Sequence, residues 1–115
     1  QNTAHDLLAR LAVVPLVLEA RGLDVTPPMI RNLRRIGDSP SVAVLERIYT
    51  DEIIHVAIGQ RWFDWTAAKR GLDPGPTWQS LVREYYKAPL KQPFNHIARG
   101  KAGLREDVYE PLARQ

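Results

Sequence analysis

The fold of this chain is decided by residues 40–70, which read PSVAVLERIYTDEIIHVAIGQRWFDWTAAKR. Apolar and small residues recur there at alternating spacings of three and four, which predicts one bundle helix roughly 45 Å long. Asp38 or Ser39 is placed to cap its start, and Gly71 is placed to end it. The predicted apolar seam of this helix comprises Val42, Leu45, Ile48, Tyr49, Glu52, His55, Val56, Gly59, Trp62, Phe63 and Thr66.

Two shorter helices are predicted before it. Residues 4–22 carry a nearly uninterrupted apolar pattern, which is typical of a helix buried on most sides. Pro15 removes a backbone hydrogen bond inside this helix, so we expect a kink there, and Gly22 is expected to end the helix. Thr26 precedes two prolines, as at many helix starts, and this predicts a short connecting helix from Pro28 to Ile36.

The remainder of the chain is expected to cover this bundle. After the turn-forming residues 73–76, Thr77 is expected to cap a C-terminal helix of about a dozen residues. Residues 89–115 are rich in turn-forming residues and are expected to pack on the bundle formed by residues 1–88. No segment alternates between apolar and polar residues over a useful length, so the sequence predicts an all-α protein.

The composition excludes several classes of protein. The 115 residues suffice for one compact domain, and 44% hydrophobic with 25% charged residues is typical of a soluble globular chain. The longest apolar run, from Leu11 to Leu18, is far shorter than the roughly 20 residues that cross a bilayer. The absence of cysteine excludes thiolate metal sites, so a metal ion has to be held by carboxylate and imidazole groups. The chain starts at Gln1 with no secretory signal, so we expect a truncated or processed start and a cytoplasmic protein that does not bind membranes.

Two ionisable residues interrupt the predicted seam. Glu52 and His55 are three positions apart, so both are expected on one face of the helix. Burying an unpaired carboxylate is costly, and a metal ion shared with the imidazole removes that cost. Helix bundles hold two-metal carboxylate centres with this Glu-x-x-His motif and with single Glu residues from other helices. Glu19, after the most apolar stretch of the chain, is the matching single Glu, and Asp51 is expected to be solvated or to support the site from outside the ligand shell.

These residues also have a simpler interpretation. A buried ion pair between an arginine and Glu19 or Glu52 would equally explain carboxylates in an apolar seam. The candidate partners are Arg21, Arg47 and Arg61. His5 and His96 lie outside the seam and are expected in solvent or at helix ends. The expected wall of a metal pocket consists of Leu18, Trp62 and Phe63, of which the two aromatic residues also fit a bundle core.

A different class of function is a non-enzymatic helical module that binds RNA or an acidic protein. Its basic residues would be Arg31, Arg34, Arg35, Lys69 and Arg70. The net charge of +3 permits an anionic partner but is low for a nucleic-acid-binding surface. Binding of this kind would weaken steeply with salt and would not depend on metal.

Five stretches of the sequence carry a family resemblance: LEARGLDVTP (18–27), IYTDEIIHVAIG (48–59), RWF (61–63), LVREY (81–85) and KQPFN (91–95). Through them, nearly the whole chain resembles the ferritin-like bacterial family known as domain of unknown function 455. The resemblance implies a ferritin-like four-helix bundle with two iron or manganese ions, related in fold to di-iron oxidases and hydroxylases. It implies that Glu19, Glu52 and His55 match ligands from the second helix pair of that bundle.

Members of this family have a preceding half that contributes another Glu helix and another Glu-x-x-His helix. The resemblance therefore implies that the chain is the C-terminal half of the family domain and that its site is incomplete by itself. We expect the missing N-terminal half, or a second copy in a homodimer, to complete it. The expected substrate of the intact oxidoreductase is a small molecule or a tRNA.

Overall fold

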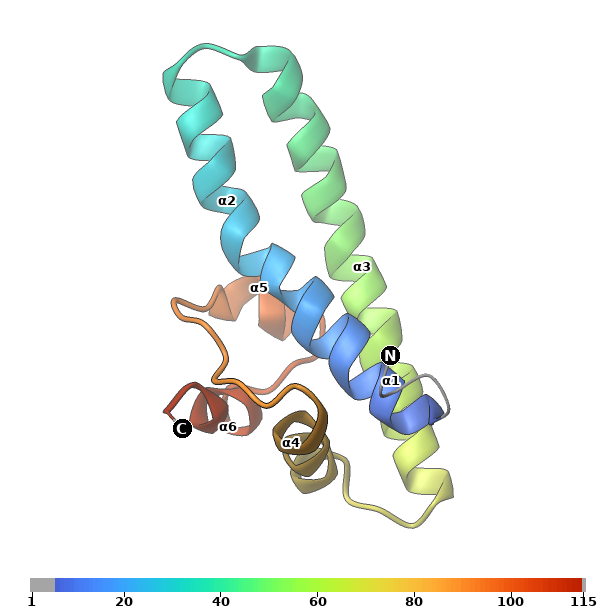
Figure 1. Ribbon diagram of the computed structural model, residues 1–115. Coiled ribbons are helices and arrows are strands. Elements are labelled where there is room, and N and C mark those ends of the chain that lie inside the picture. The colour runs from blue at the N-terminus through green and yellow to red at the C-terminus, as the bar shows by residue number, and fades with distance from the viewer. Residues whose placement is uncertain (1–5, 115) are drawn as a thin grey trace.

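The structure is a computed structural model that describes residues 6–114, and these residues form helices and turns without any strand. The all-α prediction is therefore confirmed for this part of the chain. Figure 1 shows two long helical arms that run antiparallel, with the shorter helices gathered towards one end of them. The molecule is elongated, measuring 50 × 27 × 26 Å, because the longest helix sets its length.

The first arm is one continuous helix. It consists of α1 (Leu7–Val13), a π-helix (Val14–Glu19) and α2 (Ala20–Arg35). The sequence predicted an end at Gly22 and a separate connecting helix after Thr26, and both predictions are wrong. The helix instead ends near Gly37, whose φ of 80° lies in the left-handed region that glycine adopts readily.

A distant side chain explains why α2 tolerates prolines in its interior. Pro27 has no N–H to donate to the carbonyl of Leu23, four residues earlier. The side-chain amide of Asn95 donates to that carbonyl instead, at 3.0 Å. A contact from outside the helix thus replaces the missing bond, and no local pattern in the sequence reveals it.

The irregularity predicted at Pro15 takes the form of a wider helical turn. The π-helix begins one residue before Pro15, and the N–H of Ala20 reaches back to the Pro15 carbonyl. Proline removes the bond to the residue four positions earlier, and a π-turn is one way for a helix to accommodate that loss. This turn changes the direction of every side chain that follows it, including Glu19.

The second arm, α3, spans Ser39–Lys69 and matches the predicted helix to within one residue at each end. Asp38 caps it by accepting the N–H of Ser41 at 3.1 Å. Gly71 follows its end with a φ of 70°. The capping residue and the terminal glycine in the sequence were therefore sufficient to predict where α3 begins and ends.

Two stripes of residues run along α3, and only one of them faces the first arm. The inner stripe is buried or half-buried and consists of Val42, Leu45, Tyr49, Glu52, Val56, Gly59, Phe63 and Thr66. The outer stripe consists of Val44, Ile48, Asp51, His55, Ile58, Trp62 and Trp65, and its apolar members are 39–58% exposed. The predicted seam mixed the two stripes, because both repeat at three and four residues and periodicity alone does not separate them.

The third helix, α4, spans Pro74–Tyr85 and begins three residues before the predicted start at Thr77. Asp73 precedes it in an extended conformation, and Pro74 occupies the first turn, where proline is favoured. Residues that looked like a turn therefore begin the helix. Trp78 on α4 is buried and donates its indole N–H to the carbonyl of Ala12 at 3.0 Å, which fixes α4 against α1.

The C-terminal segment contains α5 (His96–Lys101), α6 (Glu106–Tyr109) and a final 3-10 helix (Glu110–Arg114). A buried ion pair ties it to the first arm, since Nε and Nη2 of Arg99 lie 2.9 and 2.6 Å from the carboxylate oxygens of Asp24. Both side chains are almost fully buried, so each charge depends on the other.

The hydrophobic core lies where the arms meet the shorter helices. The largest fully buried side chains come from both arms, α4, α6 and the final 3-10 helix: Leu16, Leu23, Val56, Phe63, Val82, Tyr109 and Leu112. Burial of one such side chain contributes about 1.5–3 kcal/mol. This end of the molecule therefore holds the two arms in register.

Candidate metal centre

The predicted ligands come from both arms. Glu52 and His55 are three residues apart on α3, and Nδ1 of His55 is 3.3 Å from Oε1 of Glu52. The Glu52 side chain is 24% exposed on the inner stripe, whereas His55 is 62% exposed on the outer stripe. The two groups therefore meet at the border between the stripes and do not share one buried face, as the sequence suggested.

Glu52 packs against the first arm beside Glu19. A Cβ atom on Gly22 would lie 3.8 Å from Oε2 of Glu52, so the carboxylate rests against the Gly22 backbone. Gly22 and Glu19 are three residues apart and lie on neighbouring turns of one helix face. Burial raises the pKa of Glu19, the Glu52 carboxylate raises it further, and His55 opposes the rise. The charges of all three candidate ligands are thus coupled.

The arms approach each other most tightly about one helical turn from these residues. A Cβ atom on Gly59 would lie 2.5 Å from Cβ of Pro15, far inside van der Waals contact. Glycine is therefore required at this crossing. The π-helix that contains Pro15 ends at Glu19, and such helical distortions are frequent at functional sites.

The simpler interpretation, a buried pair between an arginine and one of the candidate carboxylates, does not hold. Arg21 lies 3.5 Å from Asp24, and Arg47 lies 3.6 Å from Asp51. Within residues 6–114, no arginine or lysine forms an ion pair with either candidate carboxylate. Among the described residues, Glu52 and His55 are therefore the charged groups that act on Glu19.

The residues predicted to wall the pocket lie in different environments. Phe63 belongs to the inner stripe and is fully buried in the core. Leu18 and Trp62 are each 53% exposed. A dry wall around the candidate ligands therefore requires a further element to cover these two side chains.

A second group of ligand-type side chains lies in the C-terminal segment. His96 is the first residue of α5, at the helix end where it was expected. Its Nε2 is 3.3 Å from Oε2 of Glu110, its Nδ1 is 3.8 Å from Oε1 of Glu106, and Nδ1 also contacts the Tyr109 hydroxyl. One ligand atom from each of the histidine and the two carboxylates lies within 4.8 Å of the others, a spacing that can hold a metal ion.

This C-terminal trio (His96, Glu106 and Glu110) was not predicted. Among residues 6–114, the ligand atoms of this trio lie within 4.8 Å of one another, whereas those of Glu19, Glu52 and His55 do not. The spacing of four between the two glutamates already placed them on one helix face. The histidine comes from a different element, so only tertiary packing brings it to them. His5, which was also expected in solvent or at a helix end, lies outside the residues that the structure describes.

The basic residues of the alternative function are exposed, and several are already paired. Arg34 forms an ion pair with Glu46, and Arg70 lies 3.4 Å from Asp6. These pairs reduce the positive charge that the surface offers to an anionic partner. Binding of RNA or an acidic protein stays a prediction.

Comparison with known proteins identifies the family of the chain. A family model described as "Protein of unknown function (DUF455)" matches residues 1–110. The chain belongs to this family. An uncharacterized protein from Haemophilus influenzae is 42% identical to this DUF455 chain over 106 residues, which are 92% of the chain and 37% of the relative.

The chain therefore spans little more than a third of the curated relative it matches. No solved structure matches the DUF455 chain. In the part of the chain that the structure describes, no helix combines the length and the apolar character needed to cross a membrane.

Proposed function

We propose that this DUF455 chain is one half of a ferritin-like helical bundle whose complete form binds two metal ions, iron or manganese. Glu52 would be shared between the two ions, His55 would bind one of them, and Glu19 would bind the other. In the intact protein the metals supply the redox chemistry of an oxygen-dependent oxidase or hydroxylase that acts on a small molecule or a tRNA.

The observation that carries the proposal is that Glu52 acts on the pKa of Glu19 while, within residues 6–114, no arginine or lysine pairs with either carboxylate. Glu19 and Glu52 come from different arms, and burial together with the Glu52 carboxylate raises the pKa of Glu19. A divalent ion between them would turn this repulsion into attraction. A single Glu on one helix and Glu-x-x-His on its neighbour is also the ligand pattern of two-metal bundles.

The residues present fit half of such a centre. The complete pattern requires the same ligands again from a second helix pair. The outer stripe of α3 is where that pair would pack, because it is apolar, exposed and contains His55. Its alternation of three and four residues is the spacing of helix–helix seams in bundles. A second copy of the chain, or further sequence such as the longer relative contains, supplies the other half.

The roles of the chain's own residues follow from their positions. In the neutral imidazole of His55, an Nδ1–H that donates to Glu52 leaves Nε2 unprotonated and able to bind a metal. The Glu52 carboxylate faces Gly22 of the first arm and is thereby held between the arms. Leu18 and Trp62, once covered by the second helix pair, would exclude water from the ligands.

The test is the iron and manganese content of the complete DUF455 protein and of its variants. Glu52→Gln and His55→Ala are expected to remove at least half of the bound metal. His96→Ala is the matched control, since it removes the other candidate histidine and is expected to leave the metal content unchanged. The proposal is wrong if Glu52→Gln and His55→Ala keep the wild-type metal content, or if only His96→Ala loses it.

The alternative, a module that binds RNA or an acidic protein, has a separate test. Filter binding of RNA to the chain at two salt concentrations measures it directly. Affinity that falls steeply with salt and is unchanged by a chelator would favour this alternative. The ion pair between Arg34 and Glu46 is the structural reason to rank it second.

A further inference from the structure

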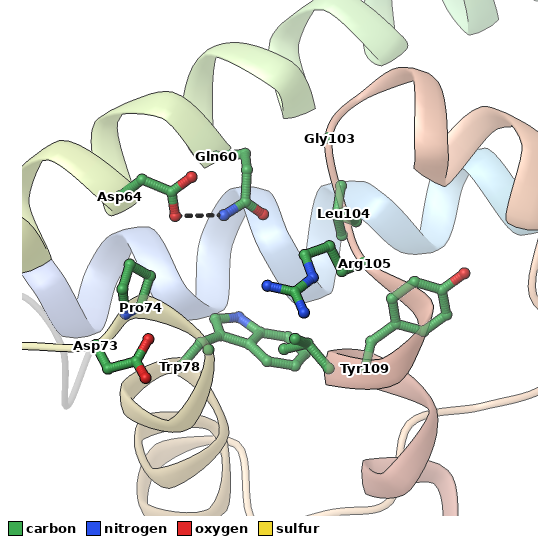
Figure 2. A pocket seen from close by; sticks show the side chains of 11 residues that line it. Gln60, Asp64, Asp73, Pro74, Trp78, Gly103, Leu104, Arg105 and Tyr109 are labelled. Carbon is green, nitrogen blue, oxygen red and sulfur yellow. Dashed lines mark hydrogen bonds between the residues drawn. The ribbon is translucent and has the colours of Figure 1, made fainter.

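A hollow of about 160 Å³ lies between α3, α4 and the C-terminal segment, and neither candidate metal trio contributes to it. Figure 2 shows Gln60 and Asp64 reaching down from α3, Asp73 and Trp78 at the start of α4 below them, and Arg105 between these two sides. Apolar side chains complete the lining, among them Leu104 and Val108. The hollow is therefore a largely apolar space with polar groups at one side.

Hydrogen-bond acceptors dominate that polar side. Nε2 of Gln60 donates to Oδ1 of Asp64 at 2.8 Å, which leaves the Gln60 amide oxygen and the second Asp64 oxygen as acceptors. Asp73 occupies the N-cap position of α4, yet its side chain caps no backbone N–H. Among the residues that the structure describes, neither aspartate forms an ion pair. Two uncompensated carboxylates thus line the same space.

An aromatic ring forms the floor beneath these acceptors. Trp78 is 4% exposed, and the bond from its indole N–H to the Ala12 carbonyl holds the ring in place. Indole rings attract cations within about 6 Å of their centre. The ring is therefore a fixed surface for a ligand that carries both positive charge and carbon.

The positive charge in the lining is already compensated. Arg105 itself lines the hollow, and its Nε and Nη2 lie 3.2 and 2.7 Å from the two carboxylate oxygens of Asp107, which does not line it. The pair carries no net charge, whereas Asp64 and Asp73 carry two negative charges. The field in the hollow therefore favours a cation and disfavours an anion.

We propose that this hollow binds a small organic cation, a primary ammonium group on a short carbon stem. Its ammonium contacts Asp64, Asp73 and the Gln60 amide oxygen, and its stem lies on Trp78. The volume limits the ligand, since a cavity of about 150 Å³ holds one benzene molecule. The ligand class is thus an amine of about six heavy atoms, and its binding does not depend on a metal.

The experiment titrates the isotope-labelled chain with n-butylammonium and follows the Trp78 indole and the backbone amides of Gln60 and Gly75 by NMR. Neutral n-butanol and anionic butyrate, at the same ionic strength, are the matched probes. We expect saturable shifts with n-butylammonium, weaker shifts with n-butanol and none with butyrate. Trp62→Phe and Trp65→Phe identify the other two indole signals, since both side chains are exposed.

Charge-removing variants locate the site. Asp64→Asn and Asp73→Asn are each expected to raise the Kd of n-butylammonium by roughly three- to tenfold. Glu84→Gln removes the same charge from α4 outside the hollow and is expected to leave the Kd unchanged. The proposal is overturned if butyrate shifts these signals as strongly as n-butylammonium, if n-butylammonium shifts none of them, or if both aspartate variants bind like Glu84→Gln.

Discussion

A single amide side chain, that of Asn95, connects three helices. Its Nδ2 donates to the Leu23 carbonyl at 3.0 Å and to the Tyr49 hydroxyl at 2.8 Å. Its Oδ1 accepts the N–H of Ala98 at 3.1 Å and so caps α5, while its own backbone N–H donates to Asp24 at 2.8 Å. Donor and acceptor ends of the amide are both used, so a side chain of another type cannot satisfy the same partners.

Asn95→Ala is expected to lower the free energy of unfolding by about 2–4 kcal/mol, because it removes a helix cap and leaves buried partners unpaired. Urea denaturation measures the change. Asn32→Ala is the control, since Asn32 is exposed at the far end of α2, and it is expected to stay within about 0.5 kcal/mol of wild type. A similar small change in Asn95→Ala would contradict this role.

Tyr109 gives the chain a dependence on alkaline pH. Burial raises the pKa of its phenol from 10.0 to about 12. The folded state thus holds this proton more tightly than the unfolded state, so its contribution to stability is complete below pH 10 and is lost as the pH rises towards 12. Tyr109→Phe has no phenol to ionise, so its stability does not fall in this way. The difference in unfolding free energy between wild type and Tyr109→Phe should therefore shrink over this range, and a constant difference would disprove the assignment.

At the scale of elements, the crossing of Pro15 and Gly59 sets the distance between the arms. Gly59→Ala is expected to cost about 1–3 kcal/mol, because the new methyl group would meet a rigid proline ring at 2.5 Å. Gly100→Ala is the control in α5, where no atom lies within 4 Å of the new Cβ, and it is expected to be neutral or to stabilise by up to about 1 kcal/mol. Thermal denaturation of both variants measures the contrast, and equal stabilities would show that the arms can separate freely.

The elements that could be predicted are those whose signals are local. α3 has its cap at Asp38 and its left-handed glycine at Gly71, so its bounds followed from the sequence. The continuous first arm could not be predicted, because Asn95, some 70 residues away, accounts for the helix across Pro27.

The candidate ligands were likewise predictable in type but not in placement. Glu52 and His55 stand out from the sequence, yet periodicity could not assign them to different stripes of α3. The C-terminal trio and the hollow above Trp78 depend on tertiary packing, which brings together residues from different elements; in the trio, spacing relates only Glu106 to Glu110.

At the scale of the whole molecule, the outer stripe is a side of α3 that residues 6–114 leave exposed. Trp62→Glu is expected to weaken self-association of the chain while leaving its helical content unchanged, because Trp62 is a large exposed apolar member of that stripe. Ile97→Glu is the control, since Ile97 is 76% exposed on α5, away from the stripe. Sedimentation of both variants measures their mass in solution. If Trp62→Glu associates as strongly as Ile97→Glu, the outer stripe is not the interface.

The most direct test of the metal-centre account is the metal content of the chain after loading with ferrous iron or manganese, measured together with its mass in solution. We predict a dimer that retains about two metal ions, as paired half-sites of a two-metal bundle require. A folded dimer that retains neither metal would contradict the assignment of Glu19, Glu52 and His55 as ligands completed by a second copy.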